Sequence, residues 1–264
     1  MLKYIKIILT WTIVVAYLLV IPGFTLKKTE SQICNNINIT ISDSINNKFV
    51  SKYRMYKLLT SGKLPILGNR FGEINTRMLE KSIESLPEVL NAEFYKTVDG
   101  VLHVDISQRK PLIRVMGENI KGFYLDKEGE VIPLSDHYTA DVIIANGKIP
   151  ASFSIRDIQN VHQFEGEEKE KHAILIDLFD MALFFNENDF WKAQIEQVYV
   201  NQRDEFELIP RVGAHLIILG DAEGFSKKLK KLYALYQVGF DHVSWNDYEI
   251  IKLKYKNQVV CTKR

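Results

Sequence analysis

The segment "HQFEGEEKEKH" gathers the side chains of this chain whose types are best suited to holding a metal ion. It contains His162, Glu165, Glu168 and His172, and imidazole and carboxylate groups are common zinc ligands. No Cys/His cluster in the chain has the spacing of a zinc site. We therefore interpret the segment as a charged, solvated lead-in to a helix predicted from residue 173, with a metal site as the alternative.

A second acidic group, Asp126, Glu128 and Glu130, resembles the first half of a calcium-binding loop. Such a loop needs further oxygen ligands at a fixed spacing, and the chain does not continue that spacing. We expect a charged β-turn at this place instead.

Motifs of the common enzyme classes are missing from the sequence. There is no G-x-S-x-G, no H-E-x-x-H, no P-loop and no G-x-G-x-x-G. We therefore predict a protein that is not an enzyme, with no catalytic residue, no metal and no cofactor. Catalytic groups can lie far apart in sequence, so an anchored hydrolase stays an alternative.

The two cysteines, Cys34 and Cys261, form no C-x-x-C pair. We expect two small free thiols by default. A disulfide between them is the alternative if this part of the chain lies in an oxidising compartment.

Bulk composition is that of an ordinary globular protein. Of 264 residues, 46% are hydrophobic and 25% are charged. The formal net charge is +1, from 34 basic and 33 acidic residues. Because no basic excess exists to neutralise phosphates, we predict no nucleic-acid partner.

The amino-terminal region contains an uncharged run over residues 7–26, "IILTWTIVVAYLLVIPGFTL". A helix of that length spans about 30 Å, the thickness of a hydrocarbon core. A cleaved signal peptide needs a shorter apolar region and an A-x-A-like site, which "VIPGFTL" lacks. We predict a permanent transmembrane helix over 7–26 and a short tail over 1–6. Two lysines flank each end, so charge does not set the orientation.

Residues 31–111 predict a small α+β unit in the order strand, helix, helix, strand, strand. The expected elements cover residues 37–41, 48–62, 75–87, 90–94 and 102–106. Three sets of side chains are expected to share a face: Phe49, Tyr53, Tyr56 and Thr60; Leu79, Ile83 and Leu86; and Leu90, Ala92 and Phe94. A turn at Asp99-Gly100 would join the last two strands into a hairpin.

Residues 112–264 predict a β-rich unit with two helices, over 170–185 and 222–239, which makes the whole chain an α+β protein. Short apolar runs recur at 111–115, 122–126, 130–134, 141–145, 195–201, 205–209 and 214–219. Two final strands are expected over 247–255 and 258–263, with Ile251, Leu253 and Tyr255 on one face. The last strand is a potential open edge, and proteins normally protect such edges.

These segments, taken together, resemble the FtsQ/DivIB family of bacterial cell-division proteins over essentially the whole chain. "LEKSIESLPEVLNAEFYKTVDGVLHVDISQRKPLIRV" is similar to a POTRA domain that closes with a basic residue and a proline. "GFYLDKEGEVIPLS", "LIPRVGAHLIILG", "KLKKLYALY" and "IIKLKYKNQVVC" are similar to the family's β domain.

The resemblance implies a non-catalytic divisome scaffold in the inner membrane at the septum. Its amino end would be cytoplasmic and residues 27–264 periplasmic. Its partners would be FtsB- and FtsL-like single-span coiled-coil proteins, with no small-molecule substrate. The partner strand would add to the last strand of the β domain, where the matching residues are Tyr255, Asn257, Gln258, Val259, Val260 and Cys261. Some members carry an aromatic residue near Lys263 and a tail beyond it, which this chain lacks.

Strand addition draws affinity from backbone hydrogen bonds, so this hypothesis predicts that Val260→Pro weakens partner binding. A purely structural role is the alternative, in which Val259 and Cys261 pack inward to pin the terminus. Two further alternatives are another POTRA-bearing transport or assembly factor and a membrane-anchored periplasmic hydrolase; a membrane-anchored sensor is disfavoured because six residues before the predicted span would leave no cytoplasmic output domain. POTRA-bearing transport and assembly factors usually carry a membrane β-barrel, which needs many alternating segments that the sequence does not show.

Overall fold

The computed structural model describes residues 2–45, 47–61, 66–117, 121–150, 160–239, 245 and 247–264. The chain divides into two compact units, Met1–Gln108 (unit 1) and Arg109–Arg264 (unit 2).

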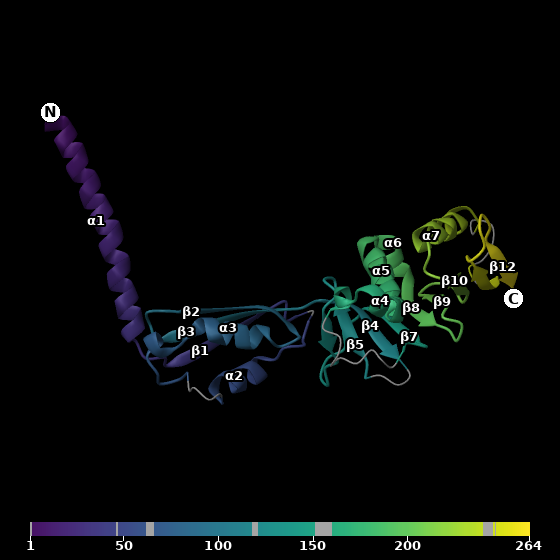
Figure 1. Cartoon of the computed structure of the whole chain (residues 1–264), viewed down its shortest axis with the longest axis horizontal. Helices are drawn as coiled ribbons and strands as arrows, with labels where there is room; N and C mark the ends of the chain where they lie inside the picture. The colour runs from purple at the N-terminus through teal and green to yellow at the C-terminus, as the bar shows by residue number, and fades with distance from the viewer. Residues whose placement is uncertain are drawn as a thin grey trace. The chain divides into compact units, whose positions relative to one another are not determined.

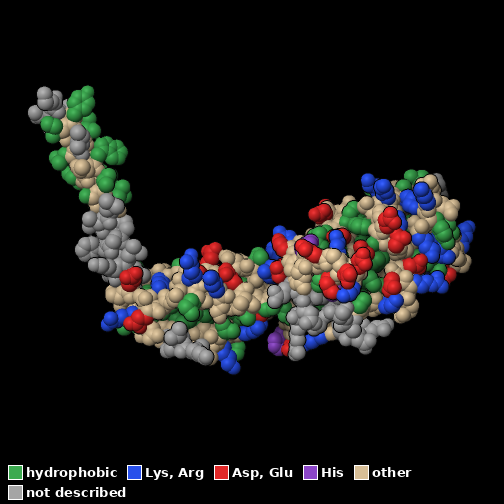
Figure 2. Space-filling model, in the orientation of Figure 1, with side chains coloured by type: hydrophobic (Ala, Val, Ile, Leu, Met, Phe, Trp, Pro, Cys, Tyr) green, Lys and Arg blue, Asp and Glu red, His purple; other side chains and the backbone are tan. Residues whose placement is uncertain are grey.

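The chain begins with one long helix, α1 (Leu2–Ser31). Its described side chains from Tyr4 to Leu18 are exposed, and Figure 2 shows hydrophobic side chains along it. Among the residues that the structure describes, no helix combines the length and apolar character needed to cross a membrane. Residues 7–26 are therefore helical as expected, but the predicted transmembrane span is not supported.

The rest of unit 1 is a sheet with helices, in the predicted order of strand, helix, helix, strand, strand (Figure 1). Its elements are β1 (Asn36–Ser42), α2 (Lys52–Thr60), the 3-10 turn η1 (Phe71–Glu73), α3 (Thr76–Glu84), β2 (Val89–Lys96) and β3 (Val101–Gln108). The described strands form a three-stranded sheet in the order β1-β3-β2. β1 runs parallel to β3, and β2 is antiparallel to it.

Helix α2 buries a different face from the one expected. Met55 and Leu59, four residues apart, are its buried residues. Tyr53 and Tyr56 are 76% and 41% exposed. The aliphatic pair has no polar atom to hydrate, whereas each tyrosine carries a hydroxyl that favours contact with water, so the helix turns its aliphatic side to the core.

Strand β2 also departs from the predicted alternation. A register shift lies between Val89 and Asn91. Because of this bulge, Val89 takes the core position, and Leu90 is 51% exposed instead of sharing a face with Ala92 and Phe94. The predicted stripe of α3 is correct at Ile83, which is fully buried.

The described residues of unit 2 form a nine-stranded sheet in the order β12-β11-β10-β9-β8-β7-β4-β5-β6. The strands are β4 (Pro111–Gly117), β5 (Phe123–Asp126), β6 (Val131–Pro133), β7 (Ile143–Gly147), β8 (Ile195–Val200), β9 (Phe206–Pro210), β10 (Leu216–Gly220), β11 (Tyr248–Lys252) and β12 (Val260–Lys263). Each of these strands lies within a segment that the sequence predicts as strand or extends it by one or two residues.

The described part of unit 2 has four α-helices, so the prediction of two was wrong. They are α4 (Gly166–Lys171), α5 (Ala173–Glu187), α6 (Asp189–Gln194) and α7 (Phe225–Ala234), with a 3-10 turn η2 (Val161–Gln163) and a π-helical turn η3 (Leu235–Gly239). The charged lead-in forms α4. Asn188 ends α5 and caps α6 by accepting the N–H of Trp191. Helix α6 lies between the predicted helix over 170–185 and the predicted strand over 195–201, where the sequence predicted no element.

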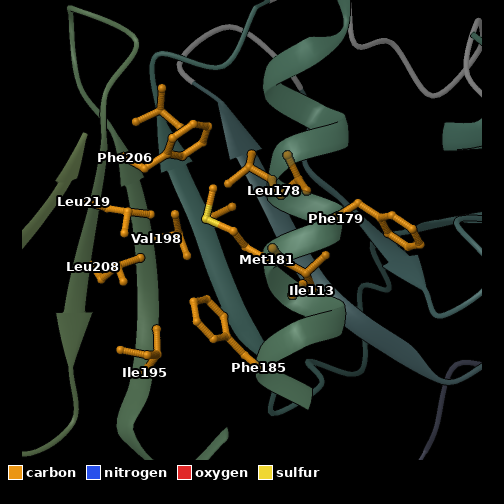
Figure 3. Packing of buried hydrophobic residues seen from close by; sticks show 14 of the residues in the cluster. Ile113, Leu178, Phe179, Met181, Phe185, Ile195, Val198, Phe206, Leu208 and Leu219 are labelled. Atoms are coloured by element: carbon orange, nitrogen blue, oxygen red, sulfur yellow. The ribbon is translucent and has the colours of Figure 1, made fainter. Parts of the chain in front are cut away.

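The core of unit 2 lies between α5 and the sheet. Figure 3 shows Leu178, Met181 and Phe185 of α5 on the side that faces Val198 and Leu208 of the strands. All five side chains are 0–1% exposed. From this packed centre the sheet continues through β9, β10 and β11 to β12.

Candidate partner-binding edge

Strand β12 stands at one end of the nine-stranded order (Figure 1). It pairs antiparallel with β11, and Ile251 lies opposite Cys261 while Lys252 lies opposite Val260. No strand in the described part of the chain pairs with its other side. The predicted C-terminal edge strand is therefore present, and one of its lateral edges is unpaired within the described residues.

The hydrogen bonds of β11 show which backbone groups of β12 face inward. The N–H of Leu253 donates to the carbonyl of Ile218 in β10 at 2.8 Å. Backbone groups alternate in direction along a strand, so those of Lys252 point the other way, toward β12. Because Lys252 lies opposite Val260, the N–H and C=O of Val260 point back to β11.

A second hydrogen bond, at Arg264, agrees on which residues of β12 direct their backbone groups toward β11. The N–H of Arg264 donates to the carbonyl of Asp247 at 3.1 Å. The N–H and C=O groups of Val260 and Arg264 point toward β11. Because the direction alternates, those of Cys261 and Lys263 point to the unpaired side of β12. A proline at Val260 would therefore break the ladder to β11. Among the predicted binding residues within β12, Cys261 is the one whose N–H points outward.

The side chains of β12 combine the two roles that the sequence left as alternatives. Val259 and Cys261 are half-buried and pack against the core of unit 2. Val260 is 38% exposed. Burial raises the pKa of the Cys261 thiol above its ordinary value. One face of the strand is thus pinned while its lateral edge stays open.

The connection between β11 and β12 contains the other predicted binding residues. Asn257 has a φ of +62°, a left-handed conformation that asparagine tolerates in turns. Tyr255 is 41% exposed, so it does not share the buried face of Ile251 and Leu253. That expectation was wrong because β11 ends at Lys252, before Tyr255.

Two long side chains hold the terminal strands to the rest of the sheet. The Nη2 of Arg264 donates to the carbonyl of Ala214 at 2.6 Å. The Nζ of Lys254 pairs with Oε1 of Glu205 at 3.2 Å. The side chain of Arg264 thereby ties the end of β12 to the residues just before β10.

His215, just before β10, forms a buried pair with a tyrosine. Its Nε2 lies 2.8 Å from the hydroxyl of Tyr236, and His215 is 3% exposed. Burial lowers the pKa of His215 and raises the pKa of Tyr236. The Trp245 ring lies 4.7 Å from that of Tyr236, centroid to centroid.

We expect this histidine to make unit 2 less stable in acid. The pKa of His215 in the folded protein lies below its unfolded value of about 6.5, so the stability it contributes is present above that value and is lost as the pH falls through the folded pKa. Urea unfolding at about pH 7.5 and about pH 5.5 should show a larger loss in the wild type than in His215→Gln. Equal losses in both proteins would contradict this assignment.

The residues considered for metal chemistry make other contacts. The ring of His172 stacks on Phe164 with centroids 3.8 Å apart, and its Nδ1 lies 2.8 Å from the carbonyl oxygen of Glu168. His162 meets Phe179 edge-on at 5.3 Å. Within the described residues, no group of three or more His, Cys, Asp or Glu side chains is placed to hold a metal ion.

The acidic turn is held by protein groups. Oδ1 of Asp126 accepts the N–H groups of Glu128 and Glu130 at 3.0 and 2.8 Å. Its Oδ2 accepts a hydrogen bond from Arg109 at 2.9 Å. The expected β-turn is therefore correct, and Arg109 of the "QRKP" segment has a structural partner that the sequence did not reveal.

A cleft of ≈ 760 Å³ lies in unit 2. Its described lining includes the charged residues Asp141, Asp189, Lys192, Glu196 and Arg211. No histidine, serine or cysteine occurs among the described residues that line it. The cleft thus does not collect the Asp, His and Ser combination that would favour the hydrolase alternative. Both cysteines are free, with Cys34 buried in unit 1.

The fold and the terminal edge strand define a two-unit α+β protein whose second unit carries a nine-stranded sheet. Residues 32–107 match the POTRA-like domain. Residues 110–262 match the family described as FtsQ/DivIB, C-terminal related. That match covers more than half of the chain, so the chain belongs to the FtsQ/DivIB-related family, and the resemblance seen in the sequence is confirmed.

A search of curated proteins finds no match. Family membership implies a role in cell division, a location at the division site and other division proteins as partners. The members of this family are non-catalytic division proteins.

Proposed function

We propose that this protein is a divisome scaffold that captures a partner by adding the partner's strand to the open edge of β12. The observation that carries the proposal is the outward direction of the backbone groups of Cys261 and Lys263 on a terminal edge strand. Each can exchange hydrogen bonds with an incoming strand without disturbing the ladder to β11.

The partner surface includes the connection before β12. Tyr255, Asn257 and Gln258 are exposed beside the edge, and Val260 presents an apolar side chain there. Strand addition draws affinity from the backbone and specificity from alternate side chains. We propose FtsB- and FtsL-like single-span coiled-coil proteins as the partners, and a role without catalysis, nucleic acid or a small-molecule substrate; membership of a cell-division family supports division proteins as the class of partner.

The proposal also includes an inner-membrane anchor. Residues 7–26 carry no charge, and Trp11 and Leu18 on α1 are 66% and 62% exposed. A helix with large apolar side chains exposed to water is unfavourable unless another phase or protein covers it. Residues 1–6 would then be cytoplasmic and residues 27–264 periplasmic.

A photocrosslinker at Val260 in dividing cells tests this function. We expect an adduct with a small single-span coiled-coil protein, recovered from the membrane fraction, and no such adduct from the exposed control position Glu187 on α5. No adduct at Val260 or at Gln258 would exclude this edge as the binding site. An outer-membrane β-barrel or a nascent barrel strand in the adduct would favour the transport alternative.

A further inference from the structure

Helix α7 places one ammonium group over the connection between β11 and β12. The Nζ of Lys231 donates to the carbonyls of Tyr255 at 2.8 Å, Leu253 at 3.3 Å and Gln258 at 3.4 Å. A lysine ammonium has three N–H donors, so these carbonyls can occupy all of them. The acceptors come from both sides of the left-handed residue Asn257.

The contact differs from those of the neighbouring lysines. Lys228 pairs with Asp221 at 2.6 Å, and Lys230 is exposed. Lys231 is half-buried, and its contacts among the described residues are backbone carbonyls rather than carboxylates. Every residue has a backbone carbonyl, so Lys231 can make this contact whatever side chains the connection carries. The contact therefore constrains the backbone path of the connection and not its side chains.

We propose that Lys231 is a positioning residue for the partner-binding edge. By gathering the three carbonyls it fixes the connection, and this holds Tyr255 and Gln258 in the conformation that a partner strand meets and sets the start of β12 against β11. The inference rests on the proposed function of β12. It adds a residue on a helix, outside the strand itself, whose removal weakens partner capture.

Charge-assisted hydrogen bonds are stronger than neutral ones. Without the ammonium, the carbonyls of Leu253, Tyr255 and Gln258 accept hydrogen bonds from separate water molecules. Separate waters do not keep the three carbonyls close to one another. The connection then samples more conformations, and the fraction of molecules with a correctly placed edge falls. Apparent affinity falls in proportion to that fraction.

Amide hydrogen exchange on the full chain tests the first step. In Lys231→Met, which keeps an unbranched apolar side chain, we expect exchange over residues 253–264 to become about tenfold faster. Exchange in β8 and β9 should stay unchanged. Lys231→Arg should restore part of the protection, because arginine also donates several hydrogen bonds. Lys230→Met is the matched control from the same helix and should exchange as the wild type does.

Photocrosslinking from Val260 tests the second step with the same variants. We expect the adduct yield to fall about tenfold in Lys231→Met and to stay near wild type in Lys230→Met. Wild-type exchange in Lys231→Met would overturn the inference, and so would faster exchange with an unchanged adduct. If the wild type itself forms no adduct, the proposed function fails, and the exchange result still decides whether Lys231 holds the connection.

Discussion

Cys261→Pro is expected to reduce partner capture at the β12 edge by at least about tenfold while unit 2 stays folded. The N–H of Cys261 points to the open side of the sheet, away from β11. Proline removes that donor and places its ring where the partner strand must approach. Edge strands tolerate proline where the N–H faces solvent, so the ladder to β11 survives. The yield of the crosslinked adduct from Gln258 measures the effect.

Two companion variants separate the backbone effect from other causes. Cys261→Ala removes the half-buried thiol but keeps the N–H, and it should retain most of the capture. Val260→Pro removes an inward N–H, and it should loosen β12 from β11, as faster amide exchange at Thr262 would show. Equal capture by Cys261→Pro and Cys261→Ala would show that the outward donor plays no part in binding.

Arg109→Met is expected to destabilise unit 2 by about 3 kcal/mol at neutral pH. Asp126 is 1% exposed, and its Oδ2 lies 2.9 Å from Nη1 of Arg109. Without the arginine, a buried carboxylate keeps only its hydrogen bonds from two backbone N–H groups. Urea unfolding followed by tryptophan fluorescence, which includes that of Trp191 in the core of unit 2, measures the change.

This destabilisation should depend on pH with a definite sign. Burial raises the pKa of Asp126 above its usual value, and the arginine opposes that shift. The stability that Asp126 contributes is therefore fully present below its unfolded pKa of about 3.9 and is lost as the pH rises through the folded pKa. Removing Arg109 raises the folded pKa further, so the variant should differ most from the wild type near neutral pH and least in acid.

The double variant Arg109→Met, Asp126→Asn is the matched control. An asparagine oxygen can still accept the N–H groups of Glu128 and Glu130, but it carries no charge to bury. We expect the double variant to be more stable than Arg109→Met at neutral pH and to lose the pH dependence. A double variant less stable than Arg109→Met would show that the ion pair does not account for the effect.

Local patterns in the sequence predicted the elements of this protein well. The alternation of Ile37, Ile39 and Ile41 correctly predicted β1, and the segment "QRKP" with the strands that follow it correctly indicated the family. These features depend on side chains within a few residues of one another, and such spacing is legible in one chain. The same reasoning correctly gave the order strand, helix, helix, strand, strand in unit 1.

Local patterns failed where neighbours in space decide the outcome. The bulge that exposes Leu90 depends on the register with β3, and the face that α2 buries depends on the sheet below it. A register shift of one residue moves side chains to the other face, and nothing in the strand's own sequence reveals it.

The candidate site shows the same division. Local patterns predicted a short β-branched strand over residues 258–263 and, with the segments before it, a resemblance to the FtsQ/DivIB family. The fold was needed to place β12 at the sheet edge and to show that Cys261 and not Val260 turns its N–H outward. It also brings Lys231 within hydrogen-bond distance of three carbonyls in the connection. The reason is physical: strand order, hydrogen-bond phase and the reach of a lysine are set by pairings between residues that are distant in the chain.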